Sequence, residues 1–303
     1  SGALSILPTQ KIDATKCIHC QKCLTFHDKG CVVAASLFQT TNKNMNVQSR
    51  IDRYKNFGLR EEWVEPFFAS PEDFWDSDNG LNKTYQVPAL RNWLIDAEII
   101  DEKLRLTKLG EVLYHIYPDN PTLVWEVIWI NLSYNSVIVN WYTSRIIPSQ
   151  TFSSKMLEEI FKEDYPNHKD VTVHNAVYQL LRTLRESPVG NEMLQLIAVD
   201  PKGSSYMRKP YNDLSPEAVA YSIYKYAMTK EIDMVRVSTL YEPTETTGVV
   251  REFCIDKDEI MKKLRILHSD ADRVLVAELN MGLDHITIKP EMTPVDVLVS
   301  LTK

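Results

Sequence analysis

Four cysteines near the start of the chain have the residue type and spacing of a metal site. Cys17, Cys20 and Cys23 form a C-x2-C-x2-C run, and Cys31 follows after seven residues. Thiolate is a soft ligand that suits zinc and iron–sulfur clusters. A run of this form holds three corners of a cubane cluster while a further cysteine completes it, as in the bacterial ferredoxin motif. The pattern therefore predicts one metal centre held by all four residues.

The spacing to Cys31 leaves the metal open between a [4Fe–4S] cluster and zinc. Ferredoxins continue with x3-C-P, whereas here seven residues precede Cys31 and Val32 follows it. Zinc sites usually combine two C-x2-C pairs that lie apart in sequence, and His19 or His27 are available as substitute ligands. Clustered thiols without a visible secretion signal favour a metal over disulfides, so we expect a cytoplasmic protein. The fifth cysteine, Cys254, stands alone and is expected to be an ordinary buried residue.

The remainder of the chain has the composition of a globular protein. It has 303 residues, 44% of them hydrophobic and 25% charged, which is enough for two or three domains. No apolar run reaches membrane-spanning length, so we expect no membrane partner. The start, SGALSILPTQK, lacks an initiator methionine, so we expect a fragment of a longer protein. Residues 1–44 carry a net charge of +3 and the remainder −10, and an acidic body disfavours a nucleic-acid groove.

Apolar periodicity and capping residues predict a mainly helical body. Thr107, Asn120 and Ser215 each stand where a helix N-cap is expected, two of them before a proline. Short strands are predicted near Leu104–Leu106 and around a turn at Met281-Gly282, and residues 192–212 are expected to form an irregular or hairpin region. The fold class is mainly α with minor β: a helical domain with winged-helix-like units at 87–116 and 256–289, preceded by a small cysteine-rich metal-binding module. The expected domains are 1–44 and 45–303, the latter with subdomains 45–165 and 166–303.

Catalytic motifs are missing from the sequence. It contains no G-x-x-x-x-G-K-[ST], G-x-G-x-x-G, H-E-x-x-H or G-x-S-x-G. We therefore assign no catalytic residue and leave open whether the protein is an enzyme. Three basic groups are either DNA-facing patches or solvated helix faces: Arg182 with Arg185, Arg208 with Lys209, and Lys262 with Lys263 and Arg265. Four aromatic residues are candidates for a protein interface or for the core: Trp63, Phe67, Phe68 and Trp75.

Two stretches of the sequence resemble known proteins. KCIHCQKCLTFHDKGCVVAASL resembles the cysteine-bearing C-terminal tail of phosphoadenosine phosphosulfate (PAPS) reductase-like proteins associated with bacterial DNA phosphorothioation. The body, from FGLREEWVEPFF through ALRNWLIDAEIIDEKLRLTKLGEVLYHIYPDNPTLVWEVIWI to ILHSDADRVLVAELNMGLDHITI, is similar to a domain of unknown function fused to such proteins.

The resemblance implies a cofactor and a missing domain. It favours a [4Fe–4S] cluster at Cys17, Cys20, Cys23 and Cys31, with zinc as the alternative. It also implies an ATP-pyrophosphatase-type domain before residue 1, with an S-G-G-x-D-S phosphate loop that this sequence does not contain. We therefore expect neither PAPS reductase nor ATP pyrophosphatase activity from this chain alone.

The function expected from the sequence is that of an accessory and interaction region of a PAPS reductase-like protein. It would hold the cysteine-ligated metal centre and dock a macromolecular partner in DNA sulfur modification or defence. The acidic body favours a protein partner or the missing N-terminal catalytic domain, with DNA second. The alternative is a winged-helix DNA-binding or regulatory protein with a structural zinc site.

Protein purified without oxygen should be brown and carry about four irons per chain if the site holds a [4Fe–4S] cluster. Cys20→Ser should lower the metal content and loosen residues 10–40, because metal binding typically contributes on the order of 10 kcal/mol locally. The helical body should stay folded in this variant. Metal analysis and hydrogen exchange test both points. A colourless protein with zinc would indicate a structural zinc site, and a metal-free protein would contradict both assignments.

Overall fold

The computed structural model describes residues 4–5, 11–12, 51–269, 274–280 and 282–302. The chain divides into two compact units, Ser1–Asn46 and Val47–Lys303. In the first unit, β1 (Leu4–Ser5) pairs antiparallel with β2 (Lys11–Ile12). The expected metal ligands Cys17, Cys20, Cys23 and Cys31 lie outside the described residues. The metal centre and the predicted domain boundaries stay predictions.

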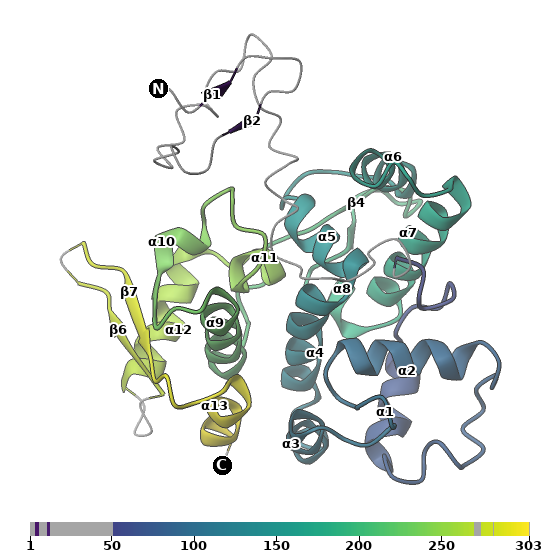
Figure 1. The fold of residues 1–303 in the computed structure, drawn as a ribbon, viewed down its shortest axis with the longest axis horizontal. Helices are drawn as coiled ribbons and strands as arrows, with labels where there is room; N and C mark the ends of the chain where they lie inside the picture. The colour runs from purple at the N-terminus through teal and green to yellow at the C-terminus, as the bar shows by residue number, and fades with distance from the viewer. Residues whose placement is uncertain (1–3, 6–10, 13–50, 270–273, 281, 303) are drawn as a thin grey trace. The chain divides into compact units, whose positions relative to one another are not determined.

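The second unit is mainly helical with small sheets, which confirms the coarse fold class (Figure 1). Its first part contains α1 (Glu61–Ala69), α2 (Gln86–Asp96), α3 (Lys108–Ile116), α4 (Pro121–Asn135), α5 (Val137–Arg145), α6 (Ser154–Asp164), α7 (Asp170–Arg185) and α8 (Pro188–Asn191). Its second part contains β3 (Ile197–Ala198), β4 (Tyr206–Met207), α9 (Pro216–Lys230), β5 (Met234–Arg236), α10 (Val237–Leu240), α11 (Val249–Phe253), α12 (Lys257–Ser269), β6 (Leu275–Glu278), β7 (His285–Ile288) and α13 (Pro294–Leu301).

Local sequence signals account for where several helices begin. The side chain of Thr107 accepts a hydrogen bond from the Gly110 amide at the start of α3. Asn120 accepts from the Leu123 amide at the start of α4, and Ser215 caps α9. In α4 and α9 a proline occupies the first helical position, where its missing amide hydrogen costs no intrahelical bond. These three predicted caps are confirmed.

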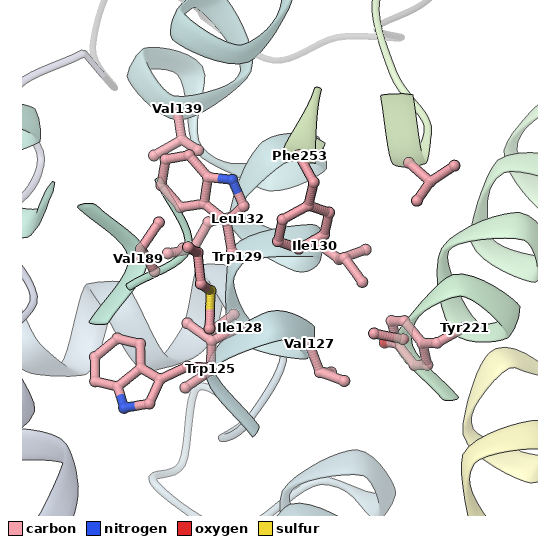
Figure 2. Packing of buried hydrophobic residues seen from close by; sticks show 14 of the residues in the cluster. Trp125, Val127, Ile128, Trp129, Ile130, Leu132, Val139, Val189, Tyr221 and Phe253 are labelled. Atoms are coloured by element: carbon pink, nitrogen blue, oxygen red, sulfur yellow. The ribbon is translucent and has the colours of Figure 1, made fainter. Parts of the chain in front are cut away.

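Helix α4 is the centre of the hydrophobic core. It contacts α2, α3, α5, α8, α9 and α11, and every residue from Leu123 to Ser133 is buried. Figure 2 shows Val127 and Ile130 pointing toward the side of Tyr221 on α9, while Val189 of α8 lies on the opposite side of the helix. A helix with neighbours all round needs apolar residues all round, as the sequence of 121–132 predicts.

The region 87–116 differs from the predicted winged-helix-like unit. Helices α2 and α3 form as expected, but the strand predicted at Leu104–Leu106 is reduced to a single bridge between Ile100 and Leu106. Leu104 itself has a φ of 66°, in the left-handed region, so the segment turns instead of extending. The chain then enters α4 without a hairpin.

The small sheets join segments that lie near the C-terminal end. Strands β3 and β4 pair antiparallel, within the hairpin region predicted from the sequence. Strands β5, β6 and β7 form a sheet with the order β5-β7-β6, and both pairings are antiparallel. Strands β6 and β7 flank the predicted turn at Met281-Gly282. Helix α12 packs against β6, and α9 contacts β5 (Figure 1).

Among the described residues, no single helix is long and apolar enough to cross a membrane. Helices α4 and α5 reach that length and composition only as a pair, and they are bent by 96° at their junction. The buried residues of α4 are the core of the second unit.

A buried arginine ties the two halves of the second unit together. Arg208, directly after β4, is 1% exposed, and its guanidinium lies 5.2 Å from the ring centroid of Tyr142. The guanidinium donates hydrogen bonds of 2.7–3.1 Å to the Gln195 side chain and to the backbone carbonyls of Thr143, Ile146, Arg251 and Glu252. These carbonyls belong to the C-terminal ends of α5 and α11, where the helix dipole favours a cation.

Replacing Arg208 should destabilise the protein strongly. Arg208→Met leaves the carbonyls of two helix ends buried without donors, so we expect a loss of about 3 kcal/mol or more. Arg208→Lys should recover only part of this loss. The compact ammonium group of lysine cannot donate to all the carbonyls that the planar guanidinium group of arginine reaches. The exposed neighbour provides the control, since Lys209→Ala should change stability by less than about 0.5 kcal/mol. Urea unfolding followed by circular dichroism measures all three, and equal stability of Arg208→Met and the wild type would contradict this role.

Candidate macromolecule-binding surface

The structure excludes most of the aromatic residues that the sequence offered for a protein interface. Trp63, Phe67 and Phe68 are at most 3% exposed and belong to the hydrophobic core, while Trp75 is half-buried and packs against it. Phe67 makes edge-to-face contacts with Phe68 and Phe74. These rings hold α1 in place and are not available to a partner.

Internal contacts occupy several of the basic residues considered for DNA binding. Arg182 forms a 2.7 Å ion pair with Glu186. Arg185 donates to the Tyr206 hydroxyl at 2.8 Å and lies 5.2 Å from the centroid of its ring. Arg208 is buried. Arg182 and Arg208 therefore contribute little free positive charge. Arg185 and Lys209 are exposed and keep theirs, because the hydrogen bond of Arg185 to a neutral tyrosine hydroxyl does not neutralise it.

Helix α12 carries the third basic group, and its charge is mixed. Its buried face consists of Ile260, Leu264 and Leu267, which pack toward α9 and β6. Lys262 is paired with Glu259 at 2.6 Å. Lys263 and Arg265 form no ion pair with any other residue that the structure describes. Lys263 and Arg265 thus follow, along the helix, an acidic first turn formed by Asp258 and Glu259.

The three-stranded sheet has one buried and one exposed face. The row Val235, Ile286 and Ala277 points into the core, and all three are at most 9% exposed. The neighbouring positions point to solvent, as the strict alternation of burial in β5 and β6 requires. The exposed face carries Met234 and Val276, which are 51% and 41% exposed. These two apolar side chains lie on the same face, on either side of Thr287 of the central strand β7.

A buried carboxyl group anchors the start of this C-terminal region to the core. Glu252 of α11 accepts a hydrogen bond from the Ser222 hydroxyl of α9 at 2.6 Å, and its backbone carbonyl accepts from the Trp129 indole at 2.9 Å. Burial raises the pKa of Glu252 to about 8, although the Ser222 hydrogen bond and the charge of Lys225 act in the opposite direction. Glu252 is therefore mostly protonated and uncharged at neutral pH.

A second buried carboxyl group fixes the start of α9. Glu126 of α4 accepts hydrogen bonds from the Tyr211 hydroxyl at 3.1 Å and from the Ser215 amide at 3.2 Å. Ser215 is also the N-cap of α9, so this contact joins the helix start to α4. Burial raises the pKa of Glu126 to about 7, and the hydrogen bonds from Ser215 and Tyr211 moderate the rise.

An open, polar cleft of about 860 Å³ lies elsewhere in the second unit. Its charged lining includes Asp101 and Arg105, which form a 2.5 Å ion pair with each other. The complete lining consists of Ser70, Pro71, Glu72, Asp73, Asp101, Leu104, Arg105, Leu106, Glu111, Tyr114 and His115. Over residues 51–269, 274–280 and 282–302, no group of three or more His, Cys, Asp or Glu side chains is arranged to hold a metal ion. Cys254 is buried and free, as predicted.

Comparisons with known proteins show the fold of the chain. No protein-family model matches it, and no curated protein matches its sequence. A crystal structure of SspB superposes with a TM-score of 0.63 at 16% identity, covering 84% of this chain and 86% of that one. A magnesium ion-bound crystal structure of SspB gives a TM-score of 0.62 with the same identity and coverage. The chain has the SspB fold. At this identity the likeness extends to the fold alone.

Sequence reasoning missed β5 and with it half of the exposed sheet face. The segment IDMVRV has apolar residues at four of six positions, two of them consecutive, so its alternation is incomplete and it is a weak strand signal. It is also short and follows directly after a long helix, so the sequence predicts no strand there. Its partner β7 lies about fifty residues further along the chain, and only the fold brings the two together.

Stability should fall as the pH rises between about 4.5 and 8. In the unfolded chain a glutamate ionises near pH 4.3, whereas folding raises the pKa of Glu252 to about 8. Within that window the unfolded state releases a proton that the folded state keeps, so the stability present at low pH is progressively lost. Glu252→Gln should flatten this dependence and reduce the loss by on the order of 1–3 kcal/mol.

Urea unfolding at about pH 5 and pH 8.5 tests this prediction. Glu72→Gln is the matched control, because Glu72 is exposed and should leave the pH dependence unchanged. Identical pH profiles for Glu252→Gln and the wild type would contradict the prediction.

Proposed function

We propose that this chain is an accessory and interaction protein of a DNA phosphorothioation system. The observation that carries the proposal is the fold that it shares with SspB, a protein associated with DNA phosphorothioation, over 84% of its length. A separate part of the chain supports the same system. The cysteine-bearing stretch at 17–31, for which the structure describes no residue, resembles the tail of phosphorothioation-associated PAPS reductase-like proteins.

In this proposal the two ends of the chain have different roles. Cys17, Cys20, Cys23 and Cys31 hold a metal centre, with [4Fe–4S] preferred over zinc because of the compact C-x2-C-x2-C run. The helical body recognises a macromolecule. A protein partner is favoured, because the body has a net charge of −10, Arg182 is paired with Glu186 and Arg208 is buried.

The element order of residues 216–288 supports the second candidate, DNA binding through a winged-helix unit. The order α9, β5, α10, α11, α12, β6, β7, with β7 between β5 and β6, is compatible with a winged-helix unit in which the short helices α10 and α11 precede α12. Helix α12 would then be the recognition helix, with Lys263 and Arg265 toward phosphates. The segment between β6 and β7, LNMGLD, contains no lysine or arginine, so the wing offers no phosphate contact. This absence, with the acidic first turn of α12, places DNA second.

A deletion in the organism that encodes the chain tests the proposed role. Phosphorothioate-linked dinucleotides, measured by mass spectrometry after nuclease digestion, should fall strongly in the deletion strain. They should return with the wild-type gene and return only in part with Cys20→Ser, because that variant weakens the metal centre. An unchanged phosphorothioate content in the deletion strain would contradict the proposal.

A mobility-shift titration separates the two partner classes. We expect no micromolar binding of duplex DNA at about 150 mM salt, because two free cations on α12 provide few phosphate contacts. Reversing the charge of Lys262, Lys263 and Arg265 together should then change nothing, as should a control reversal at the exposed Lys202, Lys209 and Lys155. Micromolar or tighter binding that weakens steeply with salt, and that only the α12 variant loses, would favour DNA instead.

A further inference from the structure

The exposed face of the β5-β7-β6 sheet carries two straight rows of side chains. The register pairs Met234 with Thr287 and Thr287 with Val276. These three side chains therefore form a row across the strands, with Thr287 in the middle and an apolar side chain at each end. One pleat further along, Arg236 pairs with His285 and His285 with Glu278. The second row therefore has a cation at one edge of the sheet and a carboxylate at the other (β6 and β7 are labelled in Figure 1).

Arg236 and Glu278 do not pair with each other within one chain. Strand β7 lies between their strands, so their backbones are two strand spacings apart, roughly 10 Å. Both side chains are exposed, and neither has an ion pair with another of the residues that the structure describes. The sheet face thus has an unpaired positive edge and an unpaired negative edge, with exposed apolar groups beside them.

We infer that this sheet face is a homodimer interface in which two copies of the chain pack face to face about a two-fold axis parallel to β7. Such an axis places β5 of one copy over β6 of the other. Each row of side chains then faces the same row of the second copy, running in the reverse order. Arg236 of one copy then faces Glu278 of the second copy, and the reverse pair forms on the other side of the axis. In the apolar row Met234 faces Val276 in the same way, twice.

Self-complementarity is the reason to choose a second copy over another protein. A two-fold interface requires one patch that matches itself after rotation, so that contact i–j is accompanied by j–i. The row of Arg236, His285 and Glu278 fulfils that condition, because its positive end meets the negative end of the second copy. The apolar row fulfils it in the same way with Met234 and Val276. Face-to-face packing of antiparallel sheets also buries the exposed side chains of all three strands at once.

The edge of the sheet is less suited to self-association than its face. The Ala277 amide of edge strand β6 donates to Nδ1 of His268 on α12 at 3.2 Å. A strand that added to β6 would have to displace this contact, whereas packing on the face disturbs no hydrogen bond. Because three short strands form a small patch, the dimer should be weak and reversible, as small interfaces are.

The decisive experiment uses charge reversal at the two edges of the row. The full chain is studied under reducing conditions by sedimentation velocity over a wide range of concentrations, and the wild type should show a reversible monomer–dimer equilibrium. Arg236→Glu places carboxylates opposite Glu278, and Glu278→Arg places guanidiniums opposite Arg236. Each single variant should raise the dimer dissociation constant at least about tenfold, because like charges across an interface repel.

Mixing the two single variants should restore association. In the mixed dimer, the Arg236→Glu chain supplies two negative edges and the Glu278→Arg chain two positive ones, so both ion pairs form. The double variant R236E/E278R should likewise return to near the wild-type dissociation constant. Lys202→Glu and Glu72→Arg change the same charges at exposed sites outside the sheet and should have no effect. Thermal unfolding confirms that the exposed substitutions leave the fold intact.

Three results would overturn the inference. The wild type could stay monomeric at all concentrations, the single variants could dimerise as well as the wild type, or the mixture could fail to associate although the wild type does. The last two would place any dimer on another surface. None of these results bears on the proposed role in phosphorothioation, which the deletion strain tests separately.

Discussion

A guanidinium group without a carboxylate partner holds the second unit together. Removing a charge from water costs several kcal/mol even after relaxation, and Arg208 is almost completely buried. The cost is offset by backbone carbonyls at the ends of α5 and α11 and by the Gln195 side chain, all within 3.1 Å. Because these partners come from different segments, moving any of them leaves the charge unsolvated. The position of α11, and of α12 directly after it, follows from this constraint.

The buried carboxyl groups of Glu126 and Glu252 also join separate segments of the second unit. Glu126 of α4 contacts the start of α9 and Glu252 of α11 contacts Ser222 of α9, and burial raises the pKa of Glu126 to about 7 and that of Glu252 to about 8. An uncharged acid forms directional hydrogen bonds without the full desolvation cost of a carboxylate. These hydrogen bonds hold α9 and α11, which precede or contact the C-terminal sheet, against the core. The outer face of the sheet does not contact the core.

The described part of the chain has an open cleft and several exposed side chains on α12 and on the β5-β7-β6 sheet. Its open cleft is lined by polar groups that pair with each other, such as Asp101 with Arg105, and it contains no set of metal ligands among the described residues. The exposed apolar and charged groups of α12 and of the β5-β7-β6 sheet are the features that a partner can recognise. This division agrees with the proposal that chemistry belongs to the cysteine-bearing stretch and recognition to the body.

The sequence by itself determined what depends on neighbouring residues. The caps at Asn120 and Ser215, the helices that follow them and the burial of α4 all come from local hydrogen bonds and from periodicity within one segment. The ligand types and spacing at 17–31 are likewise a property of the sequence alone.

Tertiary structure decided which side chains are available. The sequence predicted Arg208 to be a surface base and left Trp63 open between an interface and the core. Both are buried, because the partners that enclose them lie far away in the sequence. The same holds for the exposed sheet face. Met234 meets Thr287 only through a strand pairing across fifty residues, and such pairing depends on the energy of the whole core, which no short window of sequence contains.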